Sequence, residues 1–426
     1  MSRRTAAIAS LALLAAAALA IRALAWHRLG GPIEAVDSGI YRAFAQAMAR
    51  GDFSEVARLP FYALYPLTLA PMYAWRLPEP GYLAWLHVLA SAGTVLVLWR
   101  IGTGLMGDRA GLLLGAAAAI YPFFLFWLPY VLTETLFLFC LALYVQAYLT
   151  ALQSSRAGVW IWYWLAALAF AVSRPSAVVC LVFSWLVLGA ARAARRWGTA
   201  RGVVFALAAA LVVATGATAV VAASPAARVR LLSIPTIGQT LWASTKYATG
   251  TIEELRELEA LDQEMHRRFS GADRERREYA FKVQEAAGFI SSHPLIYLGM
   301  AGRKMVAFWL PWAFAHSWSA AHRAIDALAT IGLTLGALIC LTRRPMAPWP
   351  LAALLAMIAS FVLLSAFGQI DPDARYRLPA ELLVLILAAG GGESLLRERC
   401  APAAIESRPE RFSPTMHCAR RRLPHA

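Results

Sequence analysis

Long apolar runs separated by short polar connections dominate the sequence and set the fold that it predicts. Most runs are about 15 to 22 residues long, close to the roughly 20 residues that an α-helix needs to cross about 30 Å of hydrocarbon. We therefore predict an all-α polytopic membrane protein with about ten transmembrane helices and with interfacial helices in two external loops. The predicted spans are residues 5–26, 82–100, 109–125, 131–151, 159–173, 175–191, 202–223, 323–342, 347–366 and 378–396.

The first apolar run has two interpretations. It follows the basic segment Ser2-Arg3-Arg4, as a signal peptide or a first transmembrane helix would. The run is longer than the roughly 7 to 15 apolar residues of a signal peptide, which favours a retained span. Ala18-Leu19-Ala20 has the small residues of a cleavage site, so a signal peptide stays the alternative.

Composition agrees with a membrane protein. Hydrophobic residues make up 60% and charged residues 15% of the 426 residues, against roughly half and about a quarter in soluble domains. The five cysteines show no CxxC pairing, and three of them lie inside apolar runs, where cysteine behaves as a small hydrophobic residue. We predict neither a disulfide framework nor a zinc site.

The positions of the basic residues predict the topology. Lys and Arg concentrate in cytoplasmic connections, so the basic N-terminus is placed inside. The external loops are then 27–81, with five basic and five acidic residues, and 224–320, with twelve basic and ten acidic residues. The formal charge of +15 is accordingly an orientation signal and a contact with anionic lipids, and nucleic-acid binding is the weaker interpretation. The cytoplasmic arginines include Arg3, Arg4, Arg100, Arg109, Arg156, Arg192, Arg195, Arg196, Arg201, Arg343 and Arg344.

The same pattern predicts two parts of the chain. Residues 1–396 form the transmembrane domain, and residues 397–426 form a basic cytoplasmic tail, rich in Pro and Arg without periodicity and predicted to be disordered. Both termini are expected in the cytoplasm, with the protein in the inner (plasma) membrane and both long loops outside.

Residues 295–315 test this topology, because they are apolar enough to span. A span there would move Arg343-Arg344 and the basic tail to the outside. Arg303 and Lys304 lie near its middle, where a charge facing lipid costs several kcal/mol. We therefore predict a helix that lies in the outer interface.

The external loops carry further helices. In the first loop, Ile40, Phe44 and Met48 recur every four residues and predict one apolar helical face, with Asp37 or Ser38 at its N-terminus. Residues 60–71 are apolar but too short to span, which favours a re-entrant or interfacial piece. In the second loop, the charge-dense segments 252–269 and 273–290 predict two solvated helices.

Two acidic residues near the outer face are candidates for chemistry. Asp37 is four residues before Tyr41, so the two share a helical face, and Asp37 is either a general base or only a helix cap. Glu134 lies early in a predicted span, where a carboxylate is expensive and usually functional. Its alternative is structural pairing with an arginine.

Basic residues at the same face are candidates for phosphate binding. Arg174-Pro175 joins two predicted spans, and Arg174 is either a phosphate ligand or a snorkelling turn residue. Arg375-Tyr376-Arg377 precedes the last span on the outside, where positive charge is disfavoured unless it binds an anionic head group or is neutralised by Asp371 and Asp373. Arg303 and Lys304 are further lipid-phosphate candidates. Arg22 is expected to snorkel outward near Trp26, and the lone histidines His87, His316 and His322 favour packing or interface roles.

Several classes of protein find no support. The sequence has no glycine-rich phosphate loop, nucleophile elbow or HExxH motif, and its internal loops are too short for a nucleotide-binding domain. A nucleotide-sugar enzyme or an ATP-driven pump is therefore hard to support. The sequence supports no cofactor, and a divalent cation stays an alternative without a residue pattern behind it.

The order of these elements resembles the polytopic GT-C glycosyltransferases, most closely glycosyltransferase family 39, the protein mannosyltransferase and aminoarabinose transferase kind. The resemblance covers most of residues 1–396, and His293-Pro294 to Trp309 is similar to the family's interfacial helix. The chain differs from many family members, which have two acidic residues close together in the first loop, because the only acidic neighbour of Asp37 is Glu34. It also lacks the Trp-Trp-Asp signature of oligosaccharyltransferases. The motifs are Asp37-Ser38-Gly39-Ile40-Tyr41, Tyr65-Pro66, Pro122 with Thr133-Glu134-Thr135, Ser173-Arg174-Pro175 and Arg375-Tyr376-Arg377-Leu378-Pro379.

The resemblance implies a polyprenyl-phosphate-linked sugar as donor, used outside the cytoplasm, with Asp37 as the catalytic base and basic groups on the lipid phosphate. The acceptor, whether lipid, glycan or protein, stays open. The alternative from another class is a lipid-linked sugar flippase or transporter without transferase activity, and a third is a lipid-modifying polymerase or ligase with a similar external site. The candidate substrate-binding residues are Tyr41, Tyr62, Tyr65, Glu134, Arg174, Arg303, Lys304, Arg375, Tyr376 and Arg377.

Overall fold

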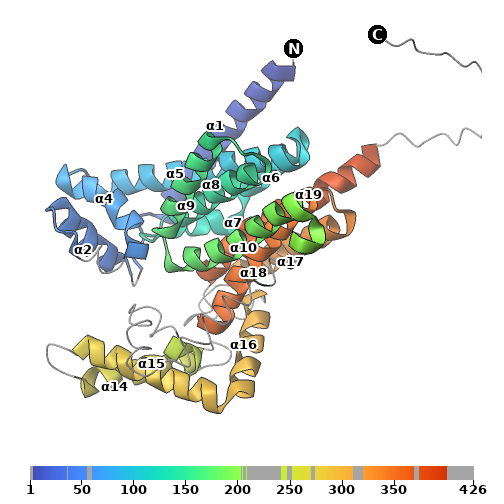
Figure 1. The fold of residues 1–426 in the computed structure, drawn as a ribbon. Helices are drawn as coiled ribbons and strands as arrows, with labels where there is room; N and C mark the ends of the chain where they lie inside the picture. The colour runs from blue at the N-terminus through green and yellow to red at the C-terminus, as the bar shows by residue number, and fades with distance from the viewer. Residues whose placement is uncertain are drawn as a thin grey trace, which may run out of the picture.

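A computed structural model describes most of the chain and is helical throughout its regular elements. The described residues are 3–35, 37–54, 60–202, 204, 208, 241–246, 252–269, 274–309, 320–368 and 374–400. Within them, one isolated β-bridge joins Ile33 and Tyr130. Figure 1 shows a bundle of long helices, with α14 and α15 outside one end of it and α16 leading back toward it.

The helices that form the bundle are mostly long and apolar, because apolar side chains and internally satisfied backbone groups are what a bilayer accepts. Among the helices that the structure describes, seven are long and apolar enough to cross a membrane. The expected all-α, multi-pass membrane protein is therefore confirmed. The seven helices are α1 (Arg3–Leu29), α5 (Glu79–Met106), α8 (Glu134–Gln153), α10 (Pro175–Trp197), α17 (Ala320–Arg343), α18 (Pro348–Gly368) and α19 (Ala374–Cys400).

Three of the ten predicted spans are not confirmed. Span 109–125 is divided into α6 (Asp108–Ile120) and α7 (Pro122–Phe126), because Pro122 lacks an N–H and Tyr121 before it is extended. The 13 residues of α6 reach about 20 Å, short of the hydrocarbon thickness. The helix α9 (Ala157–Ala171) is apolar but has only 15 residues. Span 202–223 lies almost wholly outside the described residues.

The expectation that Arg22 snorkels outward is wrong. Its side chain is fully buried, and its guanidinium donates to the hydroxyl of Ser91 at 2.7 Å. It also donates to the carbonyls of Ala118 and Ala119, both at 3.1 Å, in the last turn of α6. These carbonyls lack helical partners because α6 ends at Ile120. Arg22 therefore stabilises the helix break from inside the bundle.

Replacing Arg22 by Met is expected to destabilise the protein, because the Ser91 hydroxyl and the α6 carbonyls lose their donor. Each buried group left unsatisfied costs about 1–3 kcal/mol. The melting temperature in detergent is the measurement, and the matched control is Arg28→Met, on the same helix but exposed. Equal melting temperatures for the two variants would contradict the role given to Arg22.

The first of the two loops predicted to be external folds into short helices at one end of the bundle. They are α2 (Ser38–Ala49), the 3-10 helix η1 (Pro60–Tyr62) and α4 (Leu64–Ala74), which is too short to span, as expected. The predicted apolar face of α2 is wrong in part, since Ile40 is 52% exposed. The buried face instead consists of Ser38, Tyr41, Ala45 and Met48.

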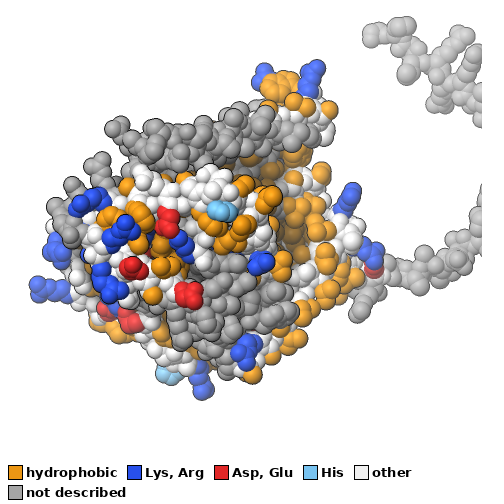
Figure 2. Space-filling view, turned by 90° about the horizontal axis from the view of Figure 1, so that it is seen from below, with side chains coloured by type: hydrophobic (Ala, Val, Ile, Leu, Met, Phe, Trp, Pro, Cys, Tyr) orange, Lys and Arg blue, Asp and Glu red, His pale blue; other side chains and the backbone are white. Residues whose placement is uncertain are grey.

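The second loop predicted to be external contains the two expected charge-rich helices, α14 (Ile252–Arg268) and α15 (Arg274–Ser292). Figure 2, which faces this end of the molecule, shows acidic and basic side chains mixed with hydrophobic ones. The next helix, α16 (Pro294–Trp309), begins at the predicted proline and is not among the helices long and apolar enough to span. At the C-terminus, α19 runs to Cys400, and residues 401–426 of the predicted tail lie outside the described residues.

Candidate active site

The predicted outer-face residues meet at the helix starts on one end of the bundle. Asp37 precedes α2, Glu134 begins α8, Arg174 precedes α10, and Arg375 lies in the first turn of α19. Ion pairs and cation–aromatic contacts connect these segments, which lie as many as 338 positions apart in the sequence. We call the group the Asp37 cluster; its members are Asp37, Tyr41, Tyr62, Glu134, Arg174, Arg375 and Tyr376.

Backbone pairing fixes the start of α2 against the segment before α8. The N–H of Ile33 donates to the carbonyl of Pro129 at 2.8 Å, and the N–H of Val131 donates back to Ile33 at 3.0 Å. The buried Ser38 hydroxyl accepts from the N–H of Ala35 and donates to the carbonyl of Val131, both at 2.9 Å. These bonds bring Asp37 to the end of the bundle where α8 begins.

A second backbone contact places Tyr62. The N–H of Leu64, just after η1, donates to the carbonyl of Val172 at 3.1 Å. Val172 lies in the turn between α9 and α10, two residues before Arg174. The turn that carries Arg174 is therefore joined to the loop that contains η1 and α4.

The Asp37 carboxylate is not used to cap its helix. Asp37 occupies the position before α2, but its side chain makes no capping hydrogen bond. Instead, Nη1 of Arg375 donates to Oδ2 of Asp37 at 3.4 Å, longer than the roughly 2.7–2.9 Å of a strong charge-assisted bond. The Asp37 side chain is 38% exposed, so the carboxylate is held loosely and is open to a ligand.

Glu134 is held more tightly. Nη1 of Arg174 donates to Oε1 of Glu134 at 3.0 Å, and both side chains are largely buried. Glu134 therefore does pair with an arginine, which was one of the two roles expected. Burial alone would lower the pKa of Arg174, but the attraction of Glu134 raises the pKa above its ordinary value. The guanidinium thus stays charged at this position.

Aromatic rings hold the two arginines in place. The guanidinium carbon of Arg174 lies 5.5 Å from the ring centroid of Phe137 and 5.1 Å from that of Tyr376. The guanidinium carbon of Arg375 lies 4.9 Å from the Tyr376 ring. Tyr376 therefore contacts both cations, and cation–π attraction positions them near each other despite their like charge.

The hydroxyls of two tyrosines in the cluster remain protonated and can donate hydrogen bonds. Burial, with a further contribution from the charge of Glu134, raises the pKa of Tyr41 above its ordinary value. Burial also raises the pKa of Tyr62 to about 12, although Arg174 acts in the opposite direction. Both hydroxyls are therefore protonated at neutral pH and able to donate to an acceptor oxygen of a ligand.

The helix directions add to the positive character of this end. The helices α8, α10 and α19 all begin here, next to Glu134, Arg174 and Arg375. A helix N-terminus carries partial positive charge and unpaired N–H groups, and it favours anions. Two guanidinium groups and three helix starts together suit a phosphate, with Asp37 as an acceptor beside them.

The remaining predicted substrate residues lie elsewhere or deeper. Tyr65 is buried under the cluster, where its ring contacts Tyr41 edge-on and its hydroxyl lies 3.0 Å from Nε2 of His87. Lys304, on α16, is buried and donates to the carbonyl of Ser244 at 2.6 Å, while Arg303 is exposed.

Arg377 is also placed apart from the cluster. It is 2% exposed, and its guanidinium donates to carboxylates of Asp326 on α17 and Glu381 one turn further along α19. The structure thus brings Arg375 and Tyr376 into the cluster and turns Arg377 into the bundle interior.

Sequence reasoning missed several residues that position the cluster. From the sequence, Ser38 has no role beyond a helix cap and membership of the first-loop motif, and Phe137 has no predicted role. Arg42 donates to Glu34 and, at 2.7 Å through Nε, to Glu79, which joins α2 to the start of α5. The only sequence signal for this network is that two oppositely charged residues, Glu34 and Arg42, lie eight residues apart.

One group of described side chains has the composition of a metal site. Ligand atoms of Asp262, His266 and Glu278, on α14 and α15, lie within 4.8 Å of one another. However, the ammonium of Lys282 donates to Asp262 at 2.5 Å and to Glu278 at 2.6 Å. A cationic side chain is therefore already paired with both carboxylates, and we assign no metal there.

The fold and the cluster define a multi-pass α-helical membrane protein with paired carboxylates and guanidinium groups at one end of its bundle. No protein-family model matches the chain, and no curated protein matches it.

Solved structures of an oligosaccharyltransferase from Archaeoglobus fulgidus are distantly similar. The structure of AglB in complex with an inhibitory peptide and a dolichol-phosphate has 12% identity and a TM-score of 0.48, covering 93% of this chain and 51% of that chain. The structure in complex with Zn and sulfate has 13% identity and a TM-score of 0.45, covering 92% and 49%. This chain thus spans about half the length of each of these proteins.

Proposed function

We propose that the chain is a membrane glycosyltransferase that moves a sugar from a polyprenyl-phosphate donor to an extracytoplasmic acceptor. The observation that carries the proposal is the placement of Asp37 beside Arg375, with Arg174 and Tyr376 next to them. A loosely held carboxylate and two nearby guanidinium groups are the groups that an inverting transfer from a phosphate needs. The motif order of the GT-C enzymes, and of family 39 in particular, agrees with this assignment.

In this mechanism, Asp37 is the general base. The acceptor's hydroxyl or amine gives its proton to Asp37 while its oxygen or nitrogen attacks the anomeric carbon. The bond between that carbon and the phosphate oxygen breaks, its electron pair leaves with the polyprenyl phosphate, and the anomeric centre inverts. The sugar is thereby joined to the acceptor, and the protonated Asp37 afterwards releases its proton to water.

The arginines stabilise the leaving phosphate. The contact between Arg375 and Asp37 is long, at 3.4 Å. A donor phosphate that draws Arg375 away therefore also frees the carboxylate to act as a base. Arg174 is fixed by Glu134 and two rings, and preorganised donors aimed at developing charge are often the largest contribution to catalysis. The prenyl chain extends into the surrounding bilayer.

Replacing Arg174 by Lys is expected to raise the donor KM about tenfold or more, because an ammonium cannot keep the planar guanidinium contacts with Glu134 and Tyr376. Initial rates at varied donor concentration measure the effect. The matched control is Arg50→Lys, at the exposed end of α2, which should leave KM unchanged. An unchanged KM for Arg174→Lys would remove Arg174 from the donor site.

Purified protein incubated with radiolabelled polyprenyl-phosphate sugar and membrane extract tests the proposed function. Label that becomes covalently joined to an acceptor supports a transferase. Label that crosses a liposome bilayer without being transferred supports the alternative, a lipid-linked sugar flippase. Mass spectrometry of the labelled product identifies the acceptor as lipid, glycan or protein.

A further inference from the structure

Two adjoining cavities lie at the opposite end of the bundle from the Asp37 cluster. The helices α5 and α8 both begin beside the cluster, since Glu79 contacts Arg42 and Glu134 contacts Arg174. Arg100 comes 21 residues after Glu79 in α5, a rise of about 32 Å, which is the thickness of the hydrocarbon core. The cavities therefore open at the other membrane surface.

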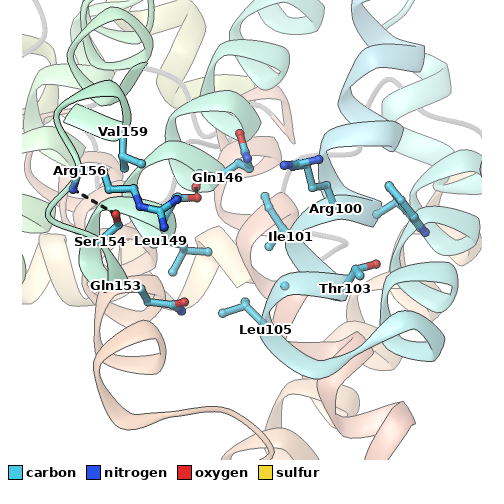
Figure 3. A pocket seen from close by; sticks show the side chains of 13 residues that line it. Arg100, Ile101, Thr103, Leu105, Gln146, Leu149, Gln153, Ser154, Arg156 and Val159 are labelled. Atoms are coloured by element: carbon cyan, nitrogen blue, oxygen red, sulfur yellow. Dashed lines mark hydrogen bonds between the residues drawn. The ribbon is translucent and has the colours of Figure 1, made fainter. Parts of the chain in front are cut away.

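The first cavity, of about 570 Å³, has basic residues in a mixed polar and apolar lining. It lies between α5, the end of α8 and the start of α9 (Figure 3). Arg100 and Arg156 extend toward each other from opposite walls in Figure 3, with Gln146 between them. None of its thirteen lining residues is acidic, so the two guanidinium groups give it an excess of positive charge. The other polar lining residues are Thr103, Thr150, Gln153 and Ser154.

The second cavity is apolar and shares a wall with the first. It has a volume of about 500 Å³ between α1 and α5, and Trp99 and Arg100 line both cavities. Apart from Arg100, all its lining residues are apolar: Ile8, Leu11, Ala12, Ala15, Leu96, Val97 and Trp99. The basic first cavity at the membrane surface thus adjoins an apolar second cavity.

We propose that these cavities bind one anionic glycerophospholipid of the surrounding leaflet. Its phosphate lies between Arg100 and Arg156, and an acyl chain lies along the groove between α1 and α5. Basic pockets between transmembrane helices suit acidic head groups, and the adjoining apolar groove selects an amphiphile over a free anion. The bound lipid joins α1, α5, α8 and α9 at this end, and the site is independent of the proposed transferase activity.

The test measures lipid binding by native mass spectrometry of the purified full chain with phosphatidylglycerol in detergent. Arg100→Gln/Arg156→Gln is expected to weaken binding ~30-fold, since each arginine near the surface contributes about fivefold. The control Arg195→Gln/Arg196→Gln removes the same charge from the exposed end of α10, on the same side, and should change binding less than about twofold. Equal losses in both variants overturn the proposal, because they indicate only the general charge of this surface.

Two further measurements separate the parts of the site. Ala12→Trp fills the apolar groove and should weaken binding of long-chain phosphatidylglycerol, whereas Ala16→Trp, exposed on the same helix and outside the cavity, should not. Inorganic phosphate at millimolar concentration should fail to displace the lipid. Displacement by phosphate, or equal binding by Ala12→Trp, contradicts a lipid occupant and points to a free anion. Elution volume and melting temperature check that each variant is folded.

Discussion

Replacing Asp37 by Asn is expected to lower sugar transfer at least ~100-fold, within the 10²–10⁴ range of general-base catalysis. Asn keeps the size of Asp but cannot take the acceptor's proton. Stability should change little, because the Asp37 side chain makes no helix-capping bond and its pair with Arg375 is long and partly exposed. Initial transfer rates and the melting temperature in detergent measure the two effects separately.

The matched control is Asp52→Asn. Asp52 lies in the same loop, is exposed, and accepts a hydrogen bond from the N–H of Ser54, so its replacement should leave transfer unchanged. A further variant, Arg375→Gln, should weaken donor binding without removing the base. Wild-type turnover by Asp37→Asn would exclude Asp37 from the chemistry, and an equal loss in Asp52→Asn would show that the loop responds to charge in general.

Replacing Arg377 by Met should destabilise the protein strongly rather than only weaken donor binding. Arg377, Asp326 and Glu381 are each about 2% exposed, and the arginine is bonded to both carboxylates. Removing one member of such a buried group typically costs about 3–5 kcal/mol, because the remaining charges are left without compensation. We therefore expect a much lower melting temperature and a poor yield of folded protein.

A rescue variant distinguishes this structural role from ligand binding. Replacing all three residues, as Arg377→Met with Asp326→Asn and Glu381→Gln, removes the uncompensated charges and should restore most of the stability. If Arg377→Met alone has the wild-type melting temperature but a raised donor KM, Arg377 contacts the donor, as the sequence pattern suggested.

The sequence predicted the membrane fold and named all seven members of the Asp37 cluster as candidates, because hydropathy and charged residues indicate where spans end. Asp37, Glu134, Arg174 and Arg375 stand out as charges next to apolar runs. Once the topology places them on one side, their proximity follows from the small area of a helix bundle. The break before Pro122 was also readable, since the residue before proline disfavours the helical conformation, but the apolar character of 109–125 obscured it.

Other features depend on how each helix is rotated about its own axis, which the hydropathy of the sequence does not predict. Arg375 and Arg377 are two residues apart, yet one contacts Asp37 and the other faces Asp326. Arg22 looked like an outward-facing residue because it lies near a span end, whereas packing of α1 against α6 directs it to free carbonyls. The hydroxyl of Ser38 donates a hydrogen bond to the carbonyl of Val131, 93 residues away. No local sequence pattern indicates this contact.

The pairing of Asp37 with Arg375 has a consequence for biosynthesis. Membrane helices are inserted from the N-terminus onward as the ribosome makes the chain, so Asp37 waits for a partner encoded 338 codons later. Until α19 has left the translocon and docked, the nascent chain lacks Arg375 and Tyr376 beside the other members of the cluster. The cluster is therefore complete only after α19 has docked, and a chain truncated before residue 374 should lack the proposed sugar transfer however well its earlier helices insert.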